Sequence, residues 1–412
     1  MNTLYSLSIF FYSILIKLAA PFNIKASQIN KGRQQVFDGI KAKIKHDRPI
    51  IWVHCASLGE FEQGRPIIEA IRKQHPGYQI FLTFFSPSGY EIRKNFDLAD
   101  YIFYLPADTK RNAQKLIELV RPEIVFFVKY EFWFHYISEL KKKNISLYIV
   151  SSIFRENQLF FKNSLMGRWY RQMLFSFEHF FVQDEQSVEL LGRLGLKNVT
   201  KAGDTRFDRV AEIARKGKNI SIVEKFKGDS QLVVAGSTWK PDEELLAQYI
   251  HSHPETKFII APHETKKGNI ERLISLLESP KICYSESTEE SVIDKQVLII
   301  DTIGLLSSIY KYADLAYIGG GFGVGIHNTL EAAIFGMPLI FGPNYLKFHE
   351  ATSMVELGIA FPVSDFSSFQ SILNQLLNDT EKKDLISGKC ITFTRQNIGA
   401  TQIVLDKVFN KH

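Results

Sequence analysis

Two glutamates in the first half of the chain have the type and position needed for proton transfer or for binding a polyhydroxyl ligand. Glu60 closes the segment His-Cys-Ala-Ser-Leu-Gly-Glu, which overlaps the end of the apolar run Ile50–His54. Glu131 lies in Lys-Tyr-Glu-Phe-Trp, directly after the apolar run Ile124–Val128. A carboxylate held in a crevice can take a proton from a hydroxyl group as a general base. Beside Tyr and Trp, a carboxylate can also accept hydrogen bonds from a sugar whose face packs on a ring.

The spacing around Glu60 has a second interpretation. Ser57 and Glu60 are three residues apart before a predicted helix at Phe61–Lys73, which is the spacing of a capping box. A helix start keeps a carboxylate ionised and makes it a weaker base, so capping and proton transfer are not exclusive. For Glu131 a packing role is harder to argue, because charged side chains are seldom buried without a partner.

The second half of the chain contains a glycine-rich turn between two predicted strands. The turn follows the run Leu315–Ile318, precedes a predicted helix at Asn328–Phe335, and includes Gly320 and Gly321. Only glycine lets the backbone turn tightly and approach a ligand closely, and a helix start presents free N–H groups with a partial positive charge. The segment therefore predicts a phosphate site. It has neither the G-x-G-x-x-G spacing of dinucleotide-binding proteins nor a G-x-x-x-x-G-K-[ST] loop.

Asn328 and Glu331 at the start of that predicted helix also have two interpretations. Their spacing is close to that of a capping box, in which side chains satisfy the helix-start N–H groups. A glutamate in this place can instead accept two hydrogen bonds from a ribose diol. The residues alone leave both interpretations open.

Small or polar residues follow three further predicted strands. They are Ser237 after Gln231–Ala235, His263 after Lys257–Ala261, and Ile303–Leu305 after Val297–Asp301. Ser237 or Thr238 fits the cap of the next helix. Ligands of parallel α/β sheets bind beyond the carboxyl ends of the strands, so these segments outline one face of a ligand site.

Two parallel sheets are needed to position all these residues. Apolar runs alternate with helical stretches such as Arg111–Leu119, and the pattern restarts after the charged stretch Gly203–Ser230. The first set of runs is Ile50–His54, Gln79–Phe85, Tyr101–Leu105, Ile124–Val128, Ser146–Ser151 and His179–Gln183. The second set is Gln231–Ala235, Lys257–Ala261, Val297–Asp301, Leu315–Ile318 and Pro338–Phe341. Such runs are typical of strands buried on both faces, so we expect two α/β halves with a crevice between them.

Composition limits the class of protein. The chain has 412 residues, enough for two domains, and its 45% hydrophobic and 23% charged residues are globular values. The net charge of +6 suits an anionic ligand or surface without requiring nucleic acid. Cys55, Cys283 and Cys390 are far apart, and the histidines lack metal-ligand spacing. We therefore expect neither a disulfide framework nor a metal site.

An apolar segment precedes the first half. Residues 4–22 are strongly apolar, but Lys17 interrupts them short of the roughly 20 residues that span a bilayer. Met1–Tyr5 lacks the basic residue that a signal peptide would require. The basic residues that follow are Lys25, Lys31, Arg33, Lys41, Lys43, Lys45 and Arg48, against Asp38 and Asp47. This pattern predicts attachment to the anionic, cytoplasmic leaflet of a membrane, either as a helix lying on the surface or as one that spans once.

In their order along the chain, these motifs resemble those of the lipopolysaccharide 3-deoxy-D-manno-octulosonic acid (Kdo) transferases. The segments that carry the resemblance are HCASLGE, TFFSPSG, KYEFW, GSTW, APHE, DTIGLL and GGGFGVGIHNTLEAAIFGMPLIFGP, beginning at residues 54, 83, 129, 236, 261, 301 and 319. The resemblance extends from the apolar helix to residue 360 and implies an α/β fold of the GT-B type. Such a glycosyltransferase has two Rossmann-like domains facing a central crevice, here with an N-terminal membrane-associated helix.

The resemblance implies an inverting transfer of Kdo from the substrate CMP-Kdo to the lipid A precursor (lipid IVA). The reaction would take place on the cytoplasmic side of the bacterial inner membrane, with no metal, no redox cofactor and no nucleic acid. Glu60 matches the family's general base, and Glu131 matches a glutamate that supports acceptor or sugar binding. The implied CMP contacts are Pro262, His263, Ile303, Gly304, Leu305, Asn328, Thr329, Leu330 and Glu331. Further contacts are expected at Ser57, Gly59, Ser237, Gly320 and Gly321.

The resemblance also implies a division of the chain. The apolar helix takes residues 1–24 and an acceptor-binding domain takes residues 25–210. A nucleotide-sugar-binding domain takes residues 211–385. A C-terminal helix, residues 386–412, is expected to pack back on the N-terminal domain.

Some residues depart from the family's pattern. Residues 262–264 read Pro-His-Glu where the family often has Pro-Arg-His, so one phosphate or carboxylate contact lacks its arginine. Lys266 or Lys267 is a candidate replacement. Leu305 stands in place of a frequent glutamate, and Ile326 in place of a glycine.

Two competing functions remain. A UDP-sugar-dependent GT-B glycosyltransferase or epimerase predicts protection by uridine nucleotides and no effect of CMP. A membrane-attached nucleotide-binding scaffold without catalysis predicts that Glu60→Gln keeps full activity in cells. Carboxylates at two strand ends of one half argue against a pure scaffold, because unpaired charges there are costly without a role.

Overall fold

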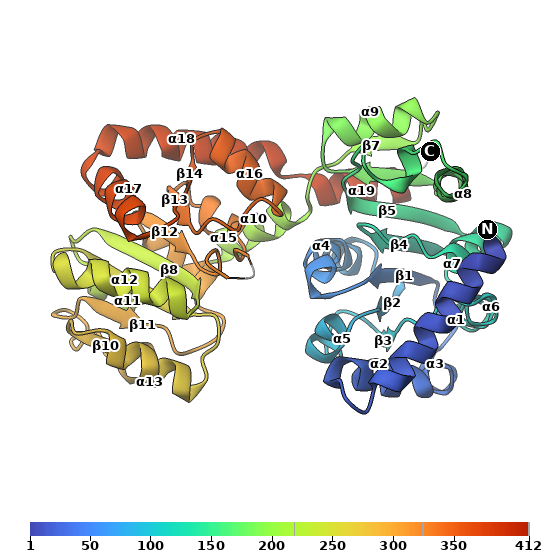
Figure 1. Cartoon of the computed structure of the whole chain (residues 1–412), viewed down its shortest axis with the longest axis horizontal. Helices are drawn as coiled ribbons and strands as arrows, with labels where there is room; N and C mark the ends of the chain where they lie inside the picture. Colours follow the sequence, from blue (N-terminus) through green and yellow to red (C-terminus); the bar gives the residue numbers. More distant parts are fainter. Residues whose placement is uncertain (218, 324, 411–412) are drawn as a thin grey trace. The chain divides into compact units, whose positions relative to one another are not determined.

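The chain forms two units in the computed structural model, which describes residues 1–217, 219–323 and 325–410. Unit 1 comprises residues 1–208 and the segment from residue 398 onward, and unit 2 comprises residues 209–397. Each unit contains one sheet of seven strands with helices around it (Figure 1). These are the two α/β halves that the apolar runs predict. The crevice between them stays a prediction.

The sheet of unit 1 is parallel throughout. Its strands are β1 (Ile50–Cys55), β2 (Gln79–Phe84), β3 (Tyr101–Tyr104), β4 (Ile124–Val128), β5 (Ser146–Ser152), β6 (His179–Val182) and β7 (Val199–Lys201). Their order across the sheet is β3-β2-β1-β4-β5-β6-β7. Every residue of β1 is buried, and its side chains alternate between two cores. Trp52 enters one core while Ile51 and Val53 enter the other, which is why the sequence of this strand is apolar without alternation.

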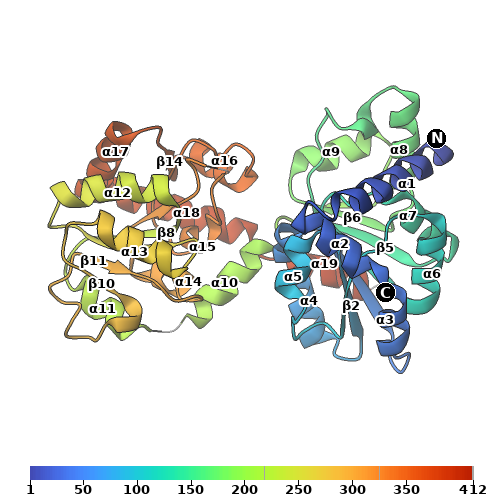
Figure 2. The same cartoon turned by 60° about the horizontal axis from the view of Figure 1, so that its bottom comes forward.

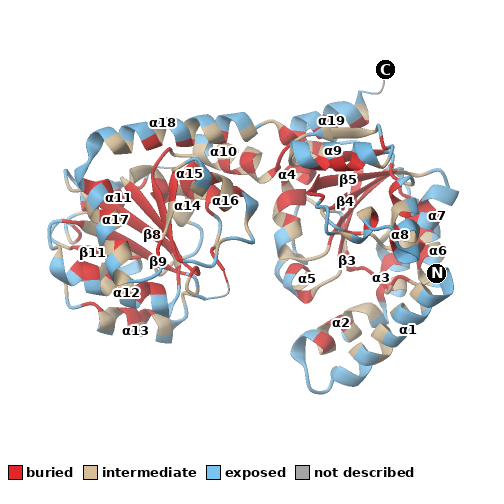
Figure 3. Cartoon of the chain, turned by 45° about the horizontal axis from the view of Figure 1, so that its top comes forward, coloured by how far each residue is buried: buried red, intermediate tan, exposed pale blue. Residues whose placement is uncertain are grey.

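Helices cover both faces of this sheet. They are α1 (Asn2–Ala19), α2 (Ile24–Gln34), α3 (Val36–Lys43), α4 (Leu58–Gln74), α5 (Pro87–Arg93), α6 (Lys110–Val120), α7 (Phe134–Lys142), the 3-10 helix η1 (Leu159–Phe161), α8 (Leu165–Leu174), α9 (Glu185–Arg193) and α19 (Ala400–Phe409). Helix α10 (Arg206–Lys216) carries the chain into unit 2. The strands are buried and the outer helix faces are exposed (Figure 3).

Unit 2 repeats this architecture. Its strands are β8 (Leu232–Thr238), β9 (Lys257–Pro262), β10 (Lys281–Cys283), β11 (Val297–Ile299), β12 (Leu315–Ile318), β13 (Leu339–Phe341) and β14 (Ala360–Pro362), in the order β10-β11-β9-β8-β12-β13-β14. Its other helices are α11 (Ser221–Lys227), α12 (Lys240–Ser252), α13 (Lys267–Leu276), η2 (Tyr284–Glu286), α14 (Leu306–Ile309), η3 (Tyr310–Tyr312), α15 (Leu330–Ala333), α16 (His349–Glu356), α17 (Phe366–Asn378) and α18 (Thr380–Asn397). All its strand pairs are parallel.

Three strands were not predicted from the sequence. Strands β7, β10 and β14 have three residues each, and each lies at the edge of its sheet. An edge strand is covered on fewer sides, so it needs no long apolar run to stabilise it. Long apolar runs were the pattern from which the other strands were predicted.

The chain returns to unit 1 at residue 398 rather than at the expected residue 386. The whole of α18 belongs to unit 2, where Cys390 is fully buried and its thiol lies 3.1 Å from the carbonyl oxygen of Ala333. Helix α19 then packs into a core of unit 1 through Val404 and Leu405. The carboxylate of Asp208 accepts hydrogen bonds from backbone N–H groups at the start of α19, including that of Thr401 at 2.7 Å.

Helix α1 takes up most of the predicted apolar segment and ends at Ala19. Among the described residues, it is the helix that is long and apolar enough to cross a membrane by length and composition, and a signal sequence or a core helix can meet the same criteria. It lies against unit 1 (Figure 2).

Candidate functional site

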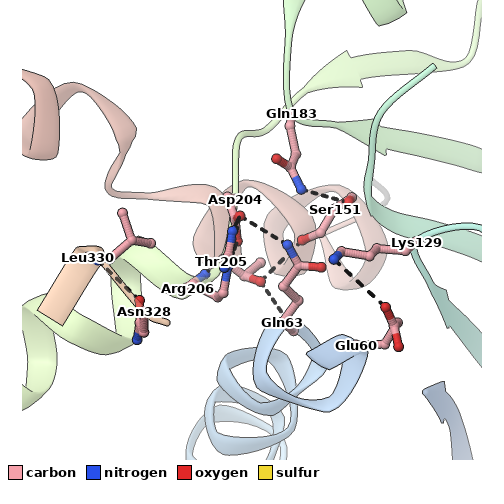
Figure 4. Close-up of polar contacts among 10 residues, drawn as sticks. All are labelled: Glu60, Gln63, Lys129, Ser151, Gln183, Asp204, Thr205, Arg206, Asn328 and Leu330. Carbon is pink, nitrogen blue, oxygen red and sulfur yellow. Dashed lines mark hydrogen bonds and ion pairs between the residues drawn. The ribbon is translucent and has the colours of Figure 1, made fainter. Parts of the chain in front are cut away.

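Glu60 lies at the carboxyl end of β1, in the first turn of α4. Ser57 caps that helix by accepting a hydrogen bond from the N–H of Gly59 at 3.2 Å. The expected capping box forms only in part, because Glu60 accepts a hydrogen bond from the Ser57 hydroxyl instead of from a backbone N–H. Its other oxygen lies 3.8 Å from the Lys129 ammonium (Figure 4). With 21% of its side chain exposed, the carboxylate is held by side chains and still open to solvent.

Lys129 owes its position to an uncommon backbone conformation. It follows β4, the strand beside β1, and its φ of 64° lies in the left-handed region that side chains other than glycine seldom adopt. Its N–H donates to the carbonyl of Val150 at 2.9 Å, which fixes the turn. Sequence reasoning noted Lys129 only as part of a motif. Its conformation and its ion pair with Glu60 came from the tertiary structure.

Glu131 is fastened two residues further on. It is 9% exposed and accepts hydrogen bonds from the indole N–H of Trp133 at 2.6 Å and from His54 Nε2 at 3.2 Å. His54 is itself held by Thr83, whose hydroxyl lies 2.9 Å from Nδ1. The partners of this carboxylate thus come from β1 and from the loop after β4, and β2 holds His54 in place. The structure places Glu60 and Glu131 just after strands of the same sheet, as predicted, and the sheet order shows that these strands, β1 and β4, are neighbours.

A buried polar cluster behind Glu60 fixes the position of α4 (Figure 4). The side-chain amide of Gln63 on that helix donates to the carboxylate of Asp204 at 3.0 Å. The backbone carbonyl of Gln63 accepts a hydrogen bond from the hydroxyl of Thr205 at 2.5 Å. That hydroxyl also lies 3.1 Å from the hydroxyl of Ser151 at the end of β5. Burial raises the pKa of Asp204, but the guanidinium of Arg206 and several hydrogen bonds outweigh this and hold the pKa below its ordinary value. Sequence reasoning treated this segment as a join and missed the cluster.

Asp242 organises the glycine-rich turn of unit 2. It is 1% exposed, and its carboxylate accepts from the N–H groups of Trp239 and Gly320, both at 2.9 Å, and from the hydroxyl of Tyr317 at 2.8 Å. Burial raises its pKa, and these hydrogen bonds counteract the rise. The residue that caps α12 is therefore Trp239, not Ser237 or Thr238 as expected.

The glycines of this turn serve the protein itself. A side chain on Gly321 would meet the backbone N of Gly342 at 2.5 Å, and one on Gly320, whose φ is +90°, would meet the carbonyl of Gly325 at 2.5 Å. The turn therefore packs backbone against backbone. This requirement accounts for Gly320 and Gly321 without a ligand.

The predicted helix at Asn328–Phe335 is only the single turn Leu330–Ala333, capped at Thr329. Asn328 accepts from the N–H of Leu330 at 3.1 Å (Figure 4) and donates to Glu331 at 2.9 Å, so the predicted capping box is wrong. One helical turn sums few peptide dipoles, which weakens the predicted reason for a phosphate site here. Burial raises the pKa of Glu331, while Asn328 and the guanidinium of Arg209 counteract it.

The remaining candidate residues gather at neighbouring strand ends of unit 2. Pro262 ends β9, and the exposed His263 follows it. Ile303 is 90% exposed beside Gly304, whose φ is +94°, and Leu305 caps α14. Because β11, β9, β8 and β12 are adjacent in the sheet, these segments lie along one edge with Ser237 and the glycine turn. The structure thus brings the candidate segments together, while binding of a ligand at this edge stays a prediction.

Three stacked rings at this edge were not predicted. His263 lies between Trp239 and His327, with ring centroids 4.7 and 4.2 Å away. The indole N–H of Trp239 donates to Nε2 of His327 at 2.9 Å, which makes this nitrogen an acceptor. The candidate replacements for the family arginine, Lys266 and Lys267, each pair with a glutamate, at 3.1 and 3.7 Å.

The stack predicts a pH-dependent stability of unit 2. Burial and the neighbouring His263 lower the pKa of His327 from 6.5 to about 4. A depressed pKa means that neutral His327 stabilises the fold above about pH 6.5, and that this contribution is lost as the pH falls towards 4. The unfolding free energy of the wild type should therefore fall more steeply between these pH values than that of His327→Gln. His46→Gln, at an exposed histidine of unit 1, is the control, and parallel curves for wild type and His327→Gln would contradict the prediction.

Comparison with known proteins gives consistent matches. Residues 31–209 match a family model described as 3-deoxy-D-manno-octulosonic-acid transferase (kdotransferase). The chain is similar to the 3-deoxy-D-manno-octulosonic acid transferase of Aquifex aeolicus, with 28% identity over 345 residues, which is 82% of this chain and 89% of that protein. The transferase of the same name from Haemophilus influenzae is 26% identical over 374 residues, 86% of each chain.

Two solved structures support the fold class. UDP-GlcNAc 2-epimerase from Neisseria meningitidis aligns with a TM-score of 0.60 at 15% identity, over 88% of this chain and 100% of that one. MurG from Acinetobacter baumannii aligns with a TM-score of 0.55 at 13% identity, over 88% and 99% of the two chains. Such identities establish the fold alone, and the predicted GT-B class is confirmed. The family model matched by residues 31–209 and the relatives that extend over most of the chain agree, so the chain is similar to the 3-deoxy-D-manno-octulosonic acid transferases, which are glycosyltransferases.

Proposed function

We propose that this protein transfers Kdo from CMP-Kdo to a lipid A precursor in lipopolysaccharide synthesis, with Glu60 as the general base. The observation that carries the proposal is the position of the Glu60 carboxylate, together with its hydrogen-bond and ion-pair partners and its partial exposure. It lies at a strand end, where a parallel sheet binds its ligands, and it is held by Ser57 and Lys129 while remaining partly exposed. A carboxylate that served only as a helix cap would bind backbone N–H groups instead.

The proposed reaction needs one proton transfer and one displacement. The acceptor hydroxyl gives its proton to Glu60 as its oxygen bonds to the anomeric carbon of Kdo. The bond from that carbon to the phosphate oxygen breaks, and CMP leaves with the electron pair. Attack from the face opposite CMP inverts the anomeric configuration. Neither a metal ion nor a redox cofactor is part of this proposal, because CMP is already a competent leaving group.

Lys129 and Glu131 would support the acceptor side. The ammonium of Lys129 holds one oxygen of Glu60, so the other can reach the acceptor when the Ser57 hydroxyl turns away. Glu131 is tied to Trp133 and His54, which suits a carboxylate that orients a sugar hydroxyl without moving.

The strand ends of unit 2 would bind CMP. The exposed Ile303 offers an apolar surface to the base, and His263 offers a ring edge to the phosphate. Glu331, oriented by Asn328, would accept hydrogen bonds from the ribose hydroxyls. Ser237, Gly320 and Gly321 are proposed as further contacts.

Glu331→Ala is expected to weaken CMP binding roughly tenfold, because a ribose hydrogen bond to a charged acceptor is lost. Isothermal titration of the full chain with CMP measures this. Glu356→Ala, at an exposed glutamate of α16 in the same unit, is the matched control and should bind as the wild type does. A fall in thermal stability with unchanged CMP affinity would show that Glu331 has only a structural role.

A thermal-shift titration with CMP, UMP and ADP side by side tests the proposed donor. A ligand that binds the native state raises the unfolding temperature, so CMP should stabilise the protein selectively. Transfer from CMP-Kdo to lipid IVA would then be assayed directly. Selective stabilisation by UMP, with no transfer from CMP-Kdo, would replace this function with a UDP-sugar transferase or epimerase of the same fold.

The proposed location is the cytoplasmic side of the bacterial inner membrane, where an amphiphilic acceptor would be found. The apolar helix α1 and the basic residues after it support this proposal.

A further inference from the structure

Helix α1 has two different faces. Side chains every third or fourth position along one face are partly buried against unit 1, namely Tyr5, Ser6, Ile9, Tyr12, Ser13 and Ile16. The opposite face consists of apolar side chains that are 48–65% exposed, namely Leu4, Leu7, Phe10, Phe11, Leu15 and Leu18. The inner face is thus covered by unit 1, whereas the outer face is uncovered apolar surface, as on a helix that lies in a membrane interface with one side on the protein.

The inner face is attached to unit 1 by specific polar contacts. The Tyr5 hydroxyl donates to the carboxylate of Asp108 at 2.6 Å. Asp108 is 1% exposed and also accepts from the N–H groups of His135 and Tyr136, both at 3.0 Å. The Ser6 hydroxyl lies 2.9 Å from Nε2 of His135. Burial raises the pKa of Asp108 to about 6, and these hydrogen bonds counteract the rise.

A second attachment lies at the very start of the helix. The indole N–H of Trp169 on α8 donates to the side chain of Asn2 at 2.7 Å. The Trp169 ring also lies 5.5 Å from that of Tyr5, and the ring of Phe134 lies 5.6 Å from Tyr5. Leaving unit 1 to cross a bilayer would break all these contacts and remove one hydrogen bond from a buried carboxylate.

Aromatic rings connect α1 to the candidate site. Tyr12 stacks on Phe85, which follows β2, with centroids 6.0 Å apart. Phe85 stacks on Trp133 at 4.7 Å, and Trp133 donates to Glu131. Asp108, Phe85 and Trp133 all follow the carboxyl ends of strands in the same sheet. Helix α1 therefore borders the edge of unit 1 that carries the two candidate carboxylates.

Length alone does not decide between spanning and lying flat. The 18 residues of α1 extend about 27 Å, close to the roughly 30 Å of a bilayer core. The charge around the exposed stripe favours the flat arrangement. Lys17, Lys25 and Lys31 are exposed, and Phe22 and Ile24 beside them are 91% and 80% exposed. Apolar side chains flanked by lysines suit the headgroup region of an anionic bilayer.

We propose that α1 lies in the plane of an anionic bilayer, attached to unit 1 by its partly buried inner face, and does not cross the membrane. Its exposed stripe enters the headgroup and acyl boundary (Figure 3 shows this outer face exposed). The arrangement holds the edge that carries Glu131 at the level of the lipid headgroups. Only this last consequence, that a membrane-embedded acceptor meets the site there, rests on the proposed function.

Single cysteines test the orientation of the helix. The native thiols of Cys55, Cys283 and Cys390 are buried, so Thr3→Cys near the start of α1 and Lys25→Cys in α2, just beyond the end of α1, add exposed thiols on either side of the apolar helix. The full chain would be treated with a membrane-impermeant maleimide in spheroplasts and in inverted inner-membrane vesicles. Both variants should react only in inverted vesicles, because both ends lie on the cytoplasmic side. Reaction of Thr3→Cys in spheroplasts alone would show a spanning helix and overturn the proposal.

Vesicle binding tests the exposed stripe. Co-sedimentation with phosphatidylglycerol–phosphatidylcholine vesicles should fall about tenfold or more in the double variant Phe11→Asp/Leu15→Asp, because two apolar contacts are replaced by charges. Leu385→Asp, at a leucine of α18 that is 62% exposed, is the matched control and should bind as the wild type does. Wild-type binding to these vesicles should exceed binding to pure phosphatidylcholine and weaken with salt.

Two outcomes of this experiment would overturn the proposal. One is vesicle binding that the double variant retains in full. The other is a wild-type oligomer that the double variant dissociates, which would assign the stripe to a second copy of the chain. Transfer to detergent-dispersed acceptor is measured separately and should persist in the double variant. If the wild type binds vesicles but does not transfer Kdo to the acceptor, the proposed function is contradicted and this inference still stands.

Discussion

Glu60→Gln is expected to lower the rate of transfer by about 10²–10⁴-fold, the usual effect of losing a general base. Glutamine keeps the shape of the side chain and can still accept a hydrogen bond from Ser57, but it cannot take a proton. CMP binding and thermal stability should stay near the wild type, because the residue is partly exposed and its ion pair with Lys129 spans 3.8 Å. Steady-state transfer from CMP-Kdo and a CMP titration measure the two effects.

Glu62→Gln provides the matched control for this experiment. Glu62 lies on the same helix and pairs with Arg93 at 2.9 Å, away from Lys129. The same chemical change at this site should leave turnover almost unchanged. Near-normal turnover of Glu60→Gln would exclude Glu60 as the base. Equal losses in both variants would point to damage to α4 instead of lost proton transfer.

Asp242→Ala is expected to have the largest effect on stability, about 3–5 kcal/mol of unfolding free energy. Alanine would leave two backbone N–H groups and the Tyr317 hydroxyl without their common acceptor in a buried place. The glycine turn at Gly320 would lose its attachment to α12, so CMP binding should weaken as well. Denaturant unfolding of the full chain, followed together with CMP titration, measures both losses.

Two variants of the same helix sharpen this prediction. Asp242→Asn keeps the shape and one good acceptor, so its loss of stability should lie between that of wild type and Asp242→Ala. Glu244→Ala removes an exposed carboxylate whose ion pair with Lys240 spans 3.7 Å, and it should cost little. A wild-type unfolding midpoint for Asp242→Ala would contradict the structural role assigned to this carboxylate.

The strands with longer apolar runs and the two strand-end carboxylates were predictable from residue types alone. All residues of β4 (Ile124–Val128) are buried, because both faces of the strand are covered, and all of them are therefore apolar. The bounds predicted for this strand are the observed ones. The same reasoning placed Glu60 and Glu131 just after two strands of one parallel sheet, and only the sheet order showed that these strands are neighbours. The motifs also indicated the similarity to the Kdo transferases, because they combine several segments in one order along the chain.

The partners of these side chains could not be predicted from the sequence, because they depend on how the chain folds back on itself. The contacts of Asp242 with Gly320, of Lys129 with Glu60 and of Tyr5 with Asp108 join residues far apart in the chain. Local spacing cannot reveal such pairs, and it misled where it suggested a capping box at Asn328. The short edge strands β7, β10 and β14 and the return of the chain at residue 398 escaped prediction for a related reason. The short edge strands and the point of return depend on which neighbouring element covers each segment. These contacts form only when the whole unit packs.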